Sequence, residues 1–324
     1  MRLSLALSQG LVALPDAGRV LLLRPPGDLD TGSLPVDRCV AVTGFRPDHD
    51  ALAARGVPVA RVPEGDFAAA IVFVPRVRDH ARAMIAQACG TLPPGAPVIV
   101  DGAKGDGIDS LLRACRGWAD IGEVYSKAHG KCFAFPATRA PADWPGAERR
   151  VEGYVTRPGV FSADGPDPGS VMLSDALPAL AGRVCDLGAG WGYLSARLLT
   201  SEAVTGLDLV EAEALALDCA RANVPDPRAA FHWADATVWT GGPYDAIVCN
   251  PPFHASRKAD PALGRAFIAA AARNLAPKGA AWFVANRHLP YEASLSDAFA
   301  QVVTRAEGAG YKVIEARRPR GTRR

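Results

Sequence analysis

The chain has 324 residues and a formal net charge of only +2, and 49% of it is apolar. This composition is typical of a soluble globular protein whose core is large enough to need no disulfide or structural metal. With so little net charge, the composition does not by itself indicate a nucleic-acid partner, and only a local basic patch could indicate one.

The cysteines and histidines argue for a reducing compartment and against a metal. The seven cysteines are scattered with no C-x-x-C pair, and the six histidines form neither H-x-x-H nor H-E-x-x-H. We therefore expect no disulfides, no metal and a cytoplasmic location. The N-terminus lacks a good leader-cleavage site and no uncharged apolar run approaches a membrane span, so we expect neither a leader nor membrane contact.

The first half of the chain alternates apolar strand-like runs with helical ones. We expect strands at 19–25, 38–44, 68–75 and 96–102, and helices at 79–92 and 106–118. Alternation of this kind predicts an α/β domain with a largely parallel sheet. Prolines and small residues then cluster at 135–150 and predict a connection between domains. We place the domains at residues 1–145 and 146–324.

The second half repeats the alternation more clearly. We expect helices at 169–180, 193–201, 211–224 and 261–277, and strands at 183–190, 203–209, 229–236, 244–250 and 280–286. The last segment, 298–318, is either a helix and a strand or a strand pair around two glycines. Both halves are therefore expected to be α/β domains in tandem.

A glycine turn follows the first strand of the second half, in the sequence DLGAGWGYL. Its spacing is G-x-G-x-G, because Tyr193 stands where a dinucleotide fingerprint would have a third glycine. This favours a ligand without a pyrophosphate, and S-adenosylmethionine fits. We expect Gly188, Ala189 and Gly190 to let it approach the backbone, and Asp186 to hold its cationic amine.

Two more acidic residues come at the ends of the next strands. Asp208 lies 22 residues after Asp186 and is placed to accept hydrogen bonds from ribose hydroxyls. Asp235 is placed to accept from an adenine amino group, with the Ala236 N–H serving a ring nitrogen. The alternative is that these aspartates only cap helices or turns.

The expected strand at 244–250 ends abruptly in the sequence NPPFH. We expect Asn250 to face and contact the cofactor. Its side-chain oxygen and the carbonyl oxygen of Pro251 are two acceptors suited to an exocyclic amino group, whose lone pair must be drawn out of the base. The prolines hold this carbonyl in place. Phe253 can stack on an extruded base, and His254 either touches substrate or has a structural role. The combination predicts a catalytic site at Asn250, Pro251 and Phe253.

Together these residues resemble the class I S-adenosylmethionine-dependent methyltransferases that modify amino groups. More narrowly, they resemble the rRNA guanine-N2 methyltransferases that act on 16S or 23S rRNA. Segments 158–170 and 284–291 are similar to segments of that family. The resemblance implies two tandem Rossmann-like methyltransferase domains, the C-terminal one catalytic with a mostly parallel seven-stranded sheet. It also implies methylation of a guanosine N2 amino group in rRNA, with 16S rRNA favoured.

The resemblance gives the N-terminal half a different role. In that family this half is a degenerate methyltransferase domain that helps to bind RNA. Here Val74-Pro75-Arg76 stands in place of Asn-Pro-Pro, and no G-x-G-x-G precedes it. We therefore expect neither cofactor nor catalysis in the first domain.

Two other functions stay open. One is the same chemistry on adenine N6 or on a protein glutamine, although Phe253, where those enzymes commonly have tyrosine, favours guanine. The other is a non-enzymatic RNA-binding scaffold with a relic pocket, against which the intact Asp186, Asp208 and Asn250 argue.

The expected partner is rRNA or a ribosomal subunit, bound by a protein that we expect to be a monomer. Arg317 and Arg318 belong to an arginine-rich end that either contacts RNA phosphates or is a solvated tail. In the first domain the basic candidates are Arg76, Arg78, Arg82 and Lys104.

Overall fold

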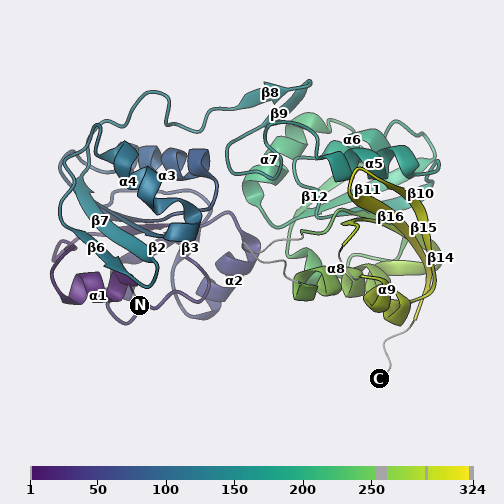
Figure 1. Ribbon diagram of the computed structural model, residues 1–324, viewed down its shortest axis with the longest axis horizontal. Helices are drawn as coiled ribbons and strands as arrows, with labels where there is room; N and C mark the ends of the chain where they lie inside the picture. Colours follow the sequence, from purple (N-terminus) through teal and green to yellow (C-terminus); the bar gives the residue numbers. More distant parts are fainter. Residues whose placement is uncertain (1, 253–260, 289–290, 321–324) are drawn as a thin grey trace. The chain divides into compact units, whose positions relative to one another are not determined.

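The computed structural model describes residues 2–252, 261–288 and 291–320 (Figure 1). The chain divides into two compact units, Met1–Glu148 and Arg149–Arg324, and each has its own seven-stranded sheet. Within the described ranges, no helix is both long and apolar enough to cross a bilayer.

The sheet of the N-terminal unit has the strand order β3-β2-β1-β4-β5-β7-β6. Its first five strands in this order are parallel, and β7 and β6 run antiparallel to their neighbours. The strands are β1 (Val20–Leu23), β2 (Cys39–Val42), β3 (Val59–Ala60), β4 (Ala69–Phe73), β5 (Pro97–Ala103), β6 (Val124–Lys127) and β7 (Gly130–Pro136). The helices are α1 (Arg2–Ser8), α2 (Arg46–Ala54), α3 (Arg78–Thr91) and α4 (Ile108–Cys115), with short 3-10 helices η1 (Val36–Arg38) and η2 (Lys104–Asp106).

Helices cover both faces of this sheet because its central strands are apolar on both sides. In β1, Leu21 and Leu23 pack in one cluster with residues of α3 and α4. Val20 and Leu22 pack in a second cluster with residues of α1 and α2. A continuous apolar run is what a central parallel strand needs, since neither face meets water.

The C-terminal unit has a sheet of order β12-β11-β10-β13-β14-β16-β15. Its first five strands in this order are parallel, and β16 and β15 are antiparallel. The strands are β10 (Gly182–Leu187), β11 (Val204–Glu211), β12 (Ala229–Trp233), β13 (Tyr244–Cys249), β14 (Leu275–Asn286), β15 (Phe299–Gly308) and β16 (Tyr311–Pro319), and a hairpin of β8 (Arg149–Val151) and β9 (Tyr154–Thr156) precedes them. The helices are α5 (Pro168–Ala176), α6 (Tyr193–Leu198), α7 (Ala214–Asn223), α8 (Pro261–Asn274) and α9 (Glu292–Ala298), with the 3-10 helix η3 (Ala236–Val238).

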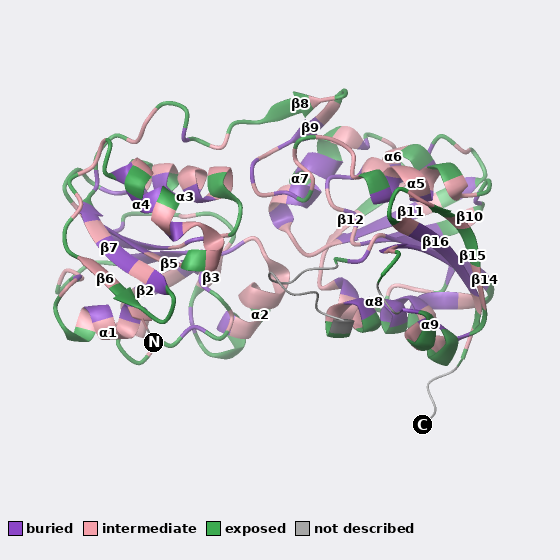
Figure 2. Cartoon of the chain, in the orientation of Figure 1, coloured by how far each residue is buried: buried purple, intermediate pink, exposed green. Residues whose placement is uncertain are grey.

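Alternate residues of β10 face different helices. Val184 packs with residues of α5, α6 and α7, whereas Cys185 and Leu187 pack with residues of α8 and α9. Buried residues accordingly concentrate in the strands of both sheets (Figure 2). The side chain of Asp186 is directed to the side of α6, where it contacts Ser195.

The two sheets share one strand order, which confirms the prediction of two tandem Rossmann-like domains. Strand β4 occupies the place in its sheet that β13 occupies in the second. The segment after β4 is Val74-Pro75-Arg76, and the segment after β13 is Asn250-Pro251-Pro252. The N-terminal unit is thus a copy of the same architecture with different residues at its strand ends.

The last segment forms a strand pair, which was one of the two predicted alternatives. Arg317 and Arg318 lie in β16 and not in a tail, and Arg317 Nε donates to Glu315 Oε1 at 2.6 Å. Arg323 and Arg324 lie outside the described residues. Several short helices and strands were not predicted from the sequence, namely α1, α2, α9, β3 and the strands from β6 to β9.

All seven cysteines lie in the described part of the chain, and all are free thiols. Six are buried and Cys89 is partly buried. Burial raises the pKa of the Cys39 thiol to about 11 and those of Cys115 and Cys132 to about 12. Such thiols ionise little near neutral pH and are poor nucleophiles.

Candidate active site

The glycine turn lies between the end of β10 and the start of α6. The N–H groups of Gly188 and Ala189 donate to the carbonyl oxygen of Val210 at 2.9 and 3.1 Å, which fixes the turn against β11. Gly190 has a φ of +55°, and a Cβ built there would have nothing within 4 Å. The backbone at Gly190 is therefore open to a ligand.

Asp186, the last acidic residue before this turn, is fully buried and has one unpaired oxygen. Its Oδ2 accepts a hydrogen bond from Ser195 Oγ at 2.7 Å, whereas its Oδ1 has no partner among the described residues. Burial raises the pKa of this carboxyl to about 7. A buried carboxylate oxygen without a partner is costly, and a bound cation would relieve that cost.

The end of β11 is occupied by Glu211, which is not among the residues predicted from the sequence. Its Oε2 accepts from the N–H of Gly190 at 2.8 Å, and its Oε1 accepts from the N–H of Glu213 at 2.7 Å. Burial raises the pKa of this carboxyl. Glu211 therefore ties the glycine turn to the end of the neighbouring strand.

Asp208 lies three residues before the end of β11 and is already paired. Arg183 Nη2 contacts its Oδ2 at 2.7 Å, and His232 Nε2 contacts its Oδ1 at 2.7 Å. The expected strand ends at Leu209, two residues before the actual end of β11, and Asp208 was assigned to the ribose as the acidic residue at that end and at the right spacing from Asp186. That assignment stays a prediction, and Glu211 is a second carboxylate nearer to the glycine turn.

Asp235 and Ala236 follow β12. The Oδ1 of Asp235 accepts from Thr237 N at 2.8 Å and from Thr237 Oγ1 at 2.6 Å, so the side chain caps η3. Ala236 is buried. The capping role is the alternative that the sequence left open, and contact of either residue with adenine stays a prediction.

Asn250 stands directly after β13, at the same carboxyl edge as the glycine turn. Its Nδ2 donates to Asp167 Oδ2 at 2.9 Å and to Ser170 Oγ at 2.8 Å. Pro251 is buried. Phe253 and His254 lie outside the described residues.

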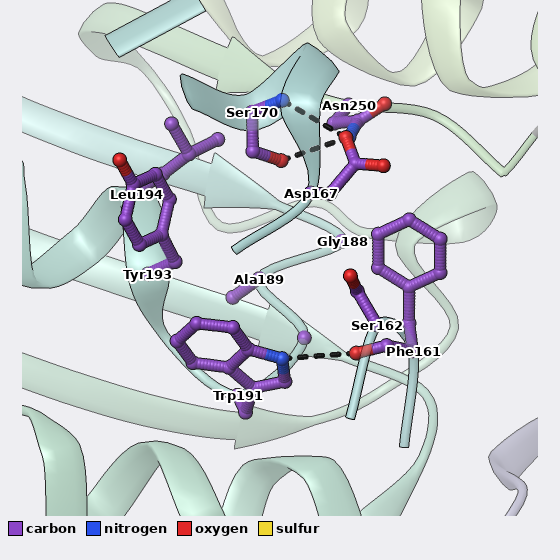
Figure 3. Close-up of a pocket in the computed structure, with 11 residues that line it drawn as sticks. Phe161, Ser162, Asp167, Ser170, Gly188, Ala189, Trp191, Tyr193, Leu194 and Asn250 are labelled. Carbon is purple, nitrogen blue, oxygen red and sulfur yellow. Dashed lines mark hydrogen bonds between the residues drawn. The ribbon is translucent and has the colours of Figure 1, made fainter. Parts of the chain in front are cut away.

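A pocket brings Asn250 and the glycine turn together with segment 161–170 (Figure 3). It holds about 390 Å³ of empty space, part of it open to solvent. Its lining residues are Phe161, Ser162, Asp167, Ser170, Gly188, Ala189, Gly190, Trp191, Tyr193, Leu194 and Asn250. Of the residues predicted to bind cofactor, the glycine turn and Asn250 line this pocket, and Asp186, Asp208, Asp235 and Ala236 do not.

The wall of the pocket opposite Asn250 is held by the indole of Trp191. Its Nε1 donates to the carbonyl oxygen of Phe161 at 2.9 Å, as Figure 3 shows. Trp191 is 4% exposed, whereas Phe161 is 61% exposed. An aromatic residue is thus held at the pocket while it remains open to solvent.

Asp167 and Ser170 lie in segment 158–170, which was singled out by its family resemblance, but no role was predicted for either residue. Asp167 followed by Pro168 is a common helix start, which marks the beginning of α5. Nothing in that pattern predicts a hydrogen bond with Asn250, 83 residues later.

The chain is similar in sequence to known methyltransferases. Residues 153–315 match the methyltransferase small domain family. The ribosomal RNA small subunit methyltransferase C of Shewanella oneidensis is 30% identical over 256 residues, with 75% of each chain covered. The protein of the same name from Shewanella piezotolerans is 32% identical over 264 residues, with 76% of each chain covered.

A solved structure has the same fold over nearly the whole chain. It is the T. thermophilus 16S rRNA N2 G1207 methyltransferase in complex with AdoMet and guanosine. The TM-score is 0.78 at 24% sequence identity, and the match covers 94% of this chain and 90% of that one.

Proposed function

Since the chain belongs to the methyltransferase small domain family and, within it, to the small subunit methyltransferase C group, we propose that it methylates 16S rRNA. The reaction transfers a methyl group from S-adenosylmethionine to the exocyclic N2 amino group of a guanosine. We place this activity in the cytoplasm, on rRNA or on a ribosomal subunit.

The observation that carries the proposal is the position of Asn250. A hydrogen-bond acceptor for an amino group is needed beside the cofactor, and Asn250 stands at the rim of the pocket that the glycine turn also lines. Its two amide hydrogens are already donated to Asp167 and Ser170, so its oxygen is the group left for substrate.

The residues present fit S-adenosylmethionine. The open backbone at Gly190 admits a ligand, and the unpaired Oδ1 of Asp186 suits the cationic amino-acid part. Glu211 or Asp208 would accept from the ribose hydroxyls, and Asp235 with Ala236 would meet the adenine. When bound, the cofactor supplies an electrophilic methyl group on a positively charged sulfur.

The protein's part in the chemistry is orientation and electrostatics. The N2 lone pair is delocalised into the guanine ring, and acceptors on its two hydrogens favour the geometry in which the lone pair is available. Asn250 Oδ1 and the Pro251 carbonyl oxygen are assigned this role, and Phe253 is assigned to stack on the base. Proximity and alignment then contribute most of the rate enhancement.

Contact with RNA phosphates is assigned to basic residues of both units. In the N-terminal unit these are Arg76, Arg78, Arg82 and Lys104, which lie after β4, in α3 and in η2. In the C-terminal unit they are Arg317 and Arg318, both in β16. His254 is a further candidate for substrate contact. Each phosphate contact would make binding weaker at higher salt.

The experiment is to incubate the purified protein with labelled S-adenosylmethionine and with 16S rRNA, 23S rRNA, small subunits or a protein fraction. Nucleoside mass spectrometry of the product should find N2-methylguanosine in 16S rRNA. The equivalent of the guanosine named for the Thermus enzyme is the first position to map. If the label appears in N6-methyladenosine or in protein, the substrate is instead adenine N6 or a protein glutamine. If calorimetry detects no binding of S-adenosylmethionine, the result would favour a non-enzymatic RNA-binding scaffold and contradict the proposal.

A further inference from the structure

The amide of Asn250 is held by two residues at the start of α5. Its Nδ2 donates to Asp167 Oδ2 at 2.9 Å and to Ser170 Oγ at 2.8 Å. Figure 3 shows the three side chains meeting at one side of the pocket. No described residue donates to the Asn250 oxygen.

The chemistry of the partners fixes which end of the amide faces them. A carboxylate only accepts hydrogen bonds, and the NH2 group of an asparagine only donates. If the Asn250 amide turned over, its oxygen would face the Asp167 carboxylate at the same separation with no hydrogen between them. The hydrogen-bonding chemistry therefore requires the NH2 group to face Asp167.

Asp167 is itself held rigidly. The same Oδ2 accepts from the N–H of Ser170 at 2.9 Å, which caps the first turn of α5. Pro168 follows at the first helical position, and Leu173 of the same helix is fully buried against the sheet. The Asn250 amide is therefore held by residues of a packed helix.

We propose that Asp167 is a positioning residue that, with Ser170, fixes the Asn250 amide with its oxygen toward the amino group of the target base. This inference rests on the proposed function, since it concerns how the acceptor is presented. Without Asp167, both amide orientations become accessible. In the wrong one, NH2 faces the substrate NH2, two donors oppose each other and the lone pair is not drawn out.

A different role is open to Asp167 because it lines the pocket. Its charge would attract the cationic amine of the cofactor directly. The two roles differ in what they require of the side chain. Positioning requires an acceptor at the place of Oδ2, whereas direct attraction of a cation requires a negative charge.

Two substitutions separate these requirements. Asp167→Ser keeps a good helix cap but is too short to reach Asn250. Asp167→Asn removes the charge but can place its own amide oxygen where Oδ2 now accepts from both Ser170 and Asn250. Ser170→Ala removes one acceptor in a helix that tolerates alanine. Asp175→Asn is the matched control, because Asp175 is an exposed residue of the same helix and lies outside the pocket.

The measurements are kcat for methylation of 16S rRNA, the Kd for S-adenosylmethionine by calorimetry and the melting temperature. Asp167→Ser should lower kcat about 10- to 100-fold with the cofactor Kd within about 2-fold of the parent protein. Asp167→Asn should restore most of that kcat, and Ser170→Ala should lower kcat about 2- to 5-fold with an unchanged Kd. Asp175→Asn should change neither quantity.

Several outcomes would overturn the inference. An active parent protein whose Asp167→Ser variant keeps its kcat would refute positioning and leave the proposed function intact. If Asp167→Ser and Asp167→Asn weaken cofactor binding equally, the residue acts through its charge. If Asp167→Ser does not fold, Ser170→Ala decides, and an unchanged kcat there counts against the inference. A parent protein that binds cofactor but methylates no RNA would instead refute the proposed function.

Discussion

Asp186 should make the free protein less stable as the pH rises toward neutrality. The carboxyl is fully buried, and burial raises its pKa from 3.8 to about 7. Between these values the folded protein holds a proton that the unfolded chain has released. Because the folded state binds more protons there, the free energy of unfolding falls as pH rises from about 4 to about 7 and then levels off.

The size of the effect follows from the shift. Each pKa unit corresponds to about 1.4 kcal/mol, so the full shift corresponds to about 4 kcal/mol above pH 7. Asp186→Asn removes the ionisation and keeps an oxygen for Ser195 Oγ. Its buried NH2 group would have no partner, which costs about 1–3 kcal/mol. At pH 8 the variant should therefore be more stable than the parent by about 1–3 kcal/mol.

The difference in free energy of unfolding between variant and parent should change with pH. This change is the better test, because the cost of burying the amide is the same at every pH and cancels. From pH 8 to pH 5 the advantage of the variant should shrink by about 3 kcal/mol, which is two pKa units. Urea denaturation at both pH values, followed by circular dichroism without cofactor, measures it. A difference between variant and parent that is the same at both pH values would refute the reasoning that Asp186 titrates near pH 7.

Three further predictions concern the same site. The affinity for S-adenosylmethionine should rise about 5- to 10-fold from pH 6 to pH 7.5 as Asp186 ionises, and calorimetry in Asp186→Asn should show no such rise. Glu211→Gln should weaken cofactor binding about 10- to 100-fold, because a glutamine cannot accept from the N–H groups of both Gly190 and Glu213. If Asp208 is instead the ribose ligand, Asp208→Asn will have the larger effect on that Kd. Asn250→Ala should abolish turnover and leave cofactor binding within about 3-fold, and near-normal turnover in a methylation assay would contradict the proposed role of the amide.

Much of the fold could be predicted because its signals are local. The central strands are continuous apolar runs, and the glycine turn marks a strand-to-helix junction. Short edge strands such as β3 (Val59–Ala60) have too few residues to show a pattern, so they were missed. Their pairing depends on the strand beside them, which local sequence does not encode.

Site residues that follow the end of an apolar strand could be predicted from the sequence. Residues whose place depends on how neighbouring strands pair could not. Asp208 was selected by its distance from Asp186 along the chain. The parallel register instead pairs Leu187 with Val210, which places Glu211 beside the start of the glycine turn. Likewise, the contact of Asn250 with Asp167 joins segments 83 residues apart, and only the folded sheet brings them together.

The buried thiols give the protein a surface that is almost free of reactive sulfur in its described part. A single cysteine introduced on an exposed helix position would therefore react with a maleimide much faster than the native seven. With one such cysteine in each unit, a dye could be attached to each without first removing any native cysteine. Fluorescence energy transfer between the two dyes would then report whether the distance between the N-terminal and C-terminal units changes when RNA is added.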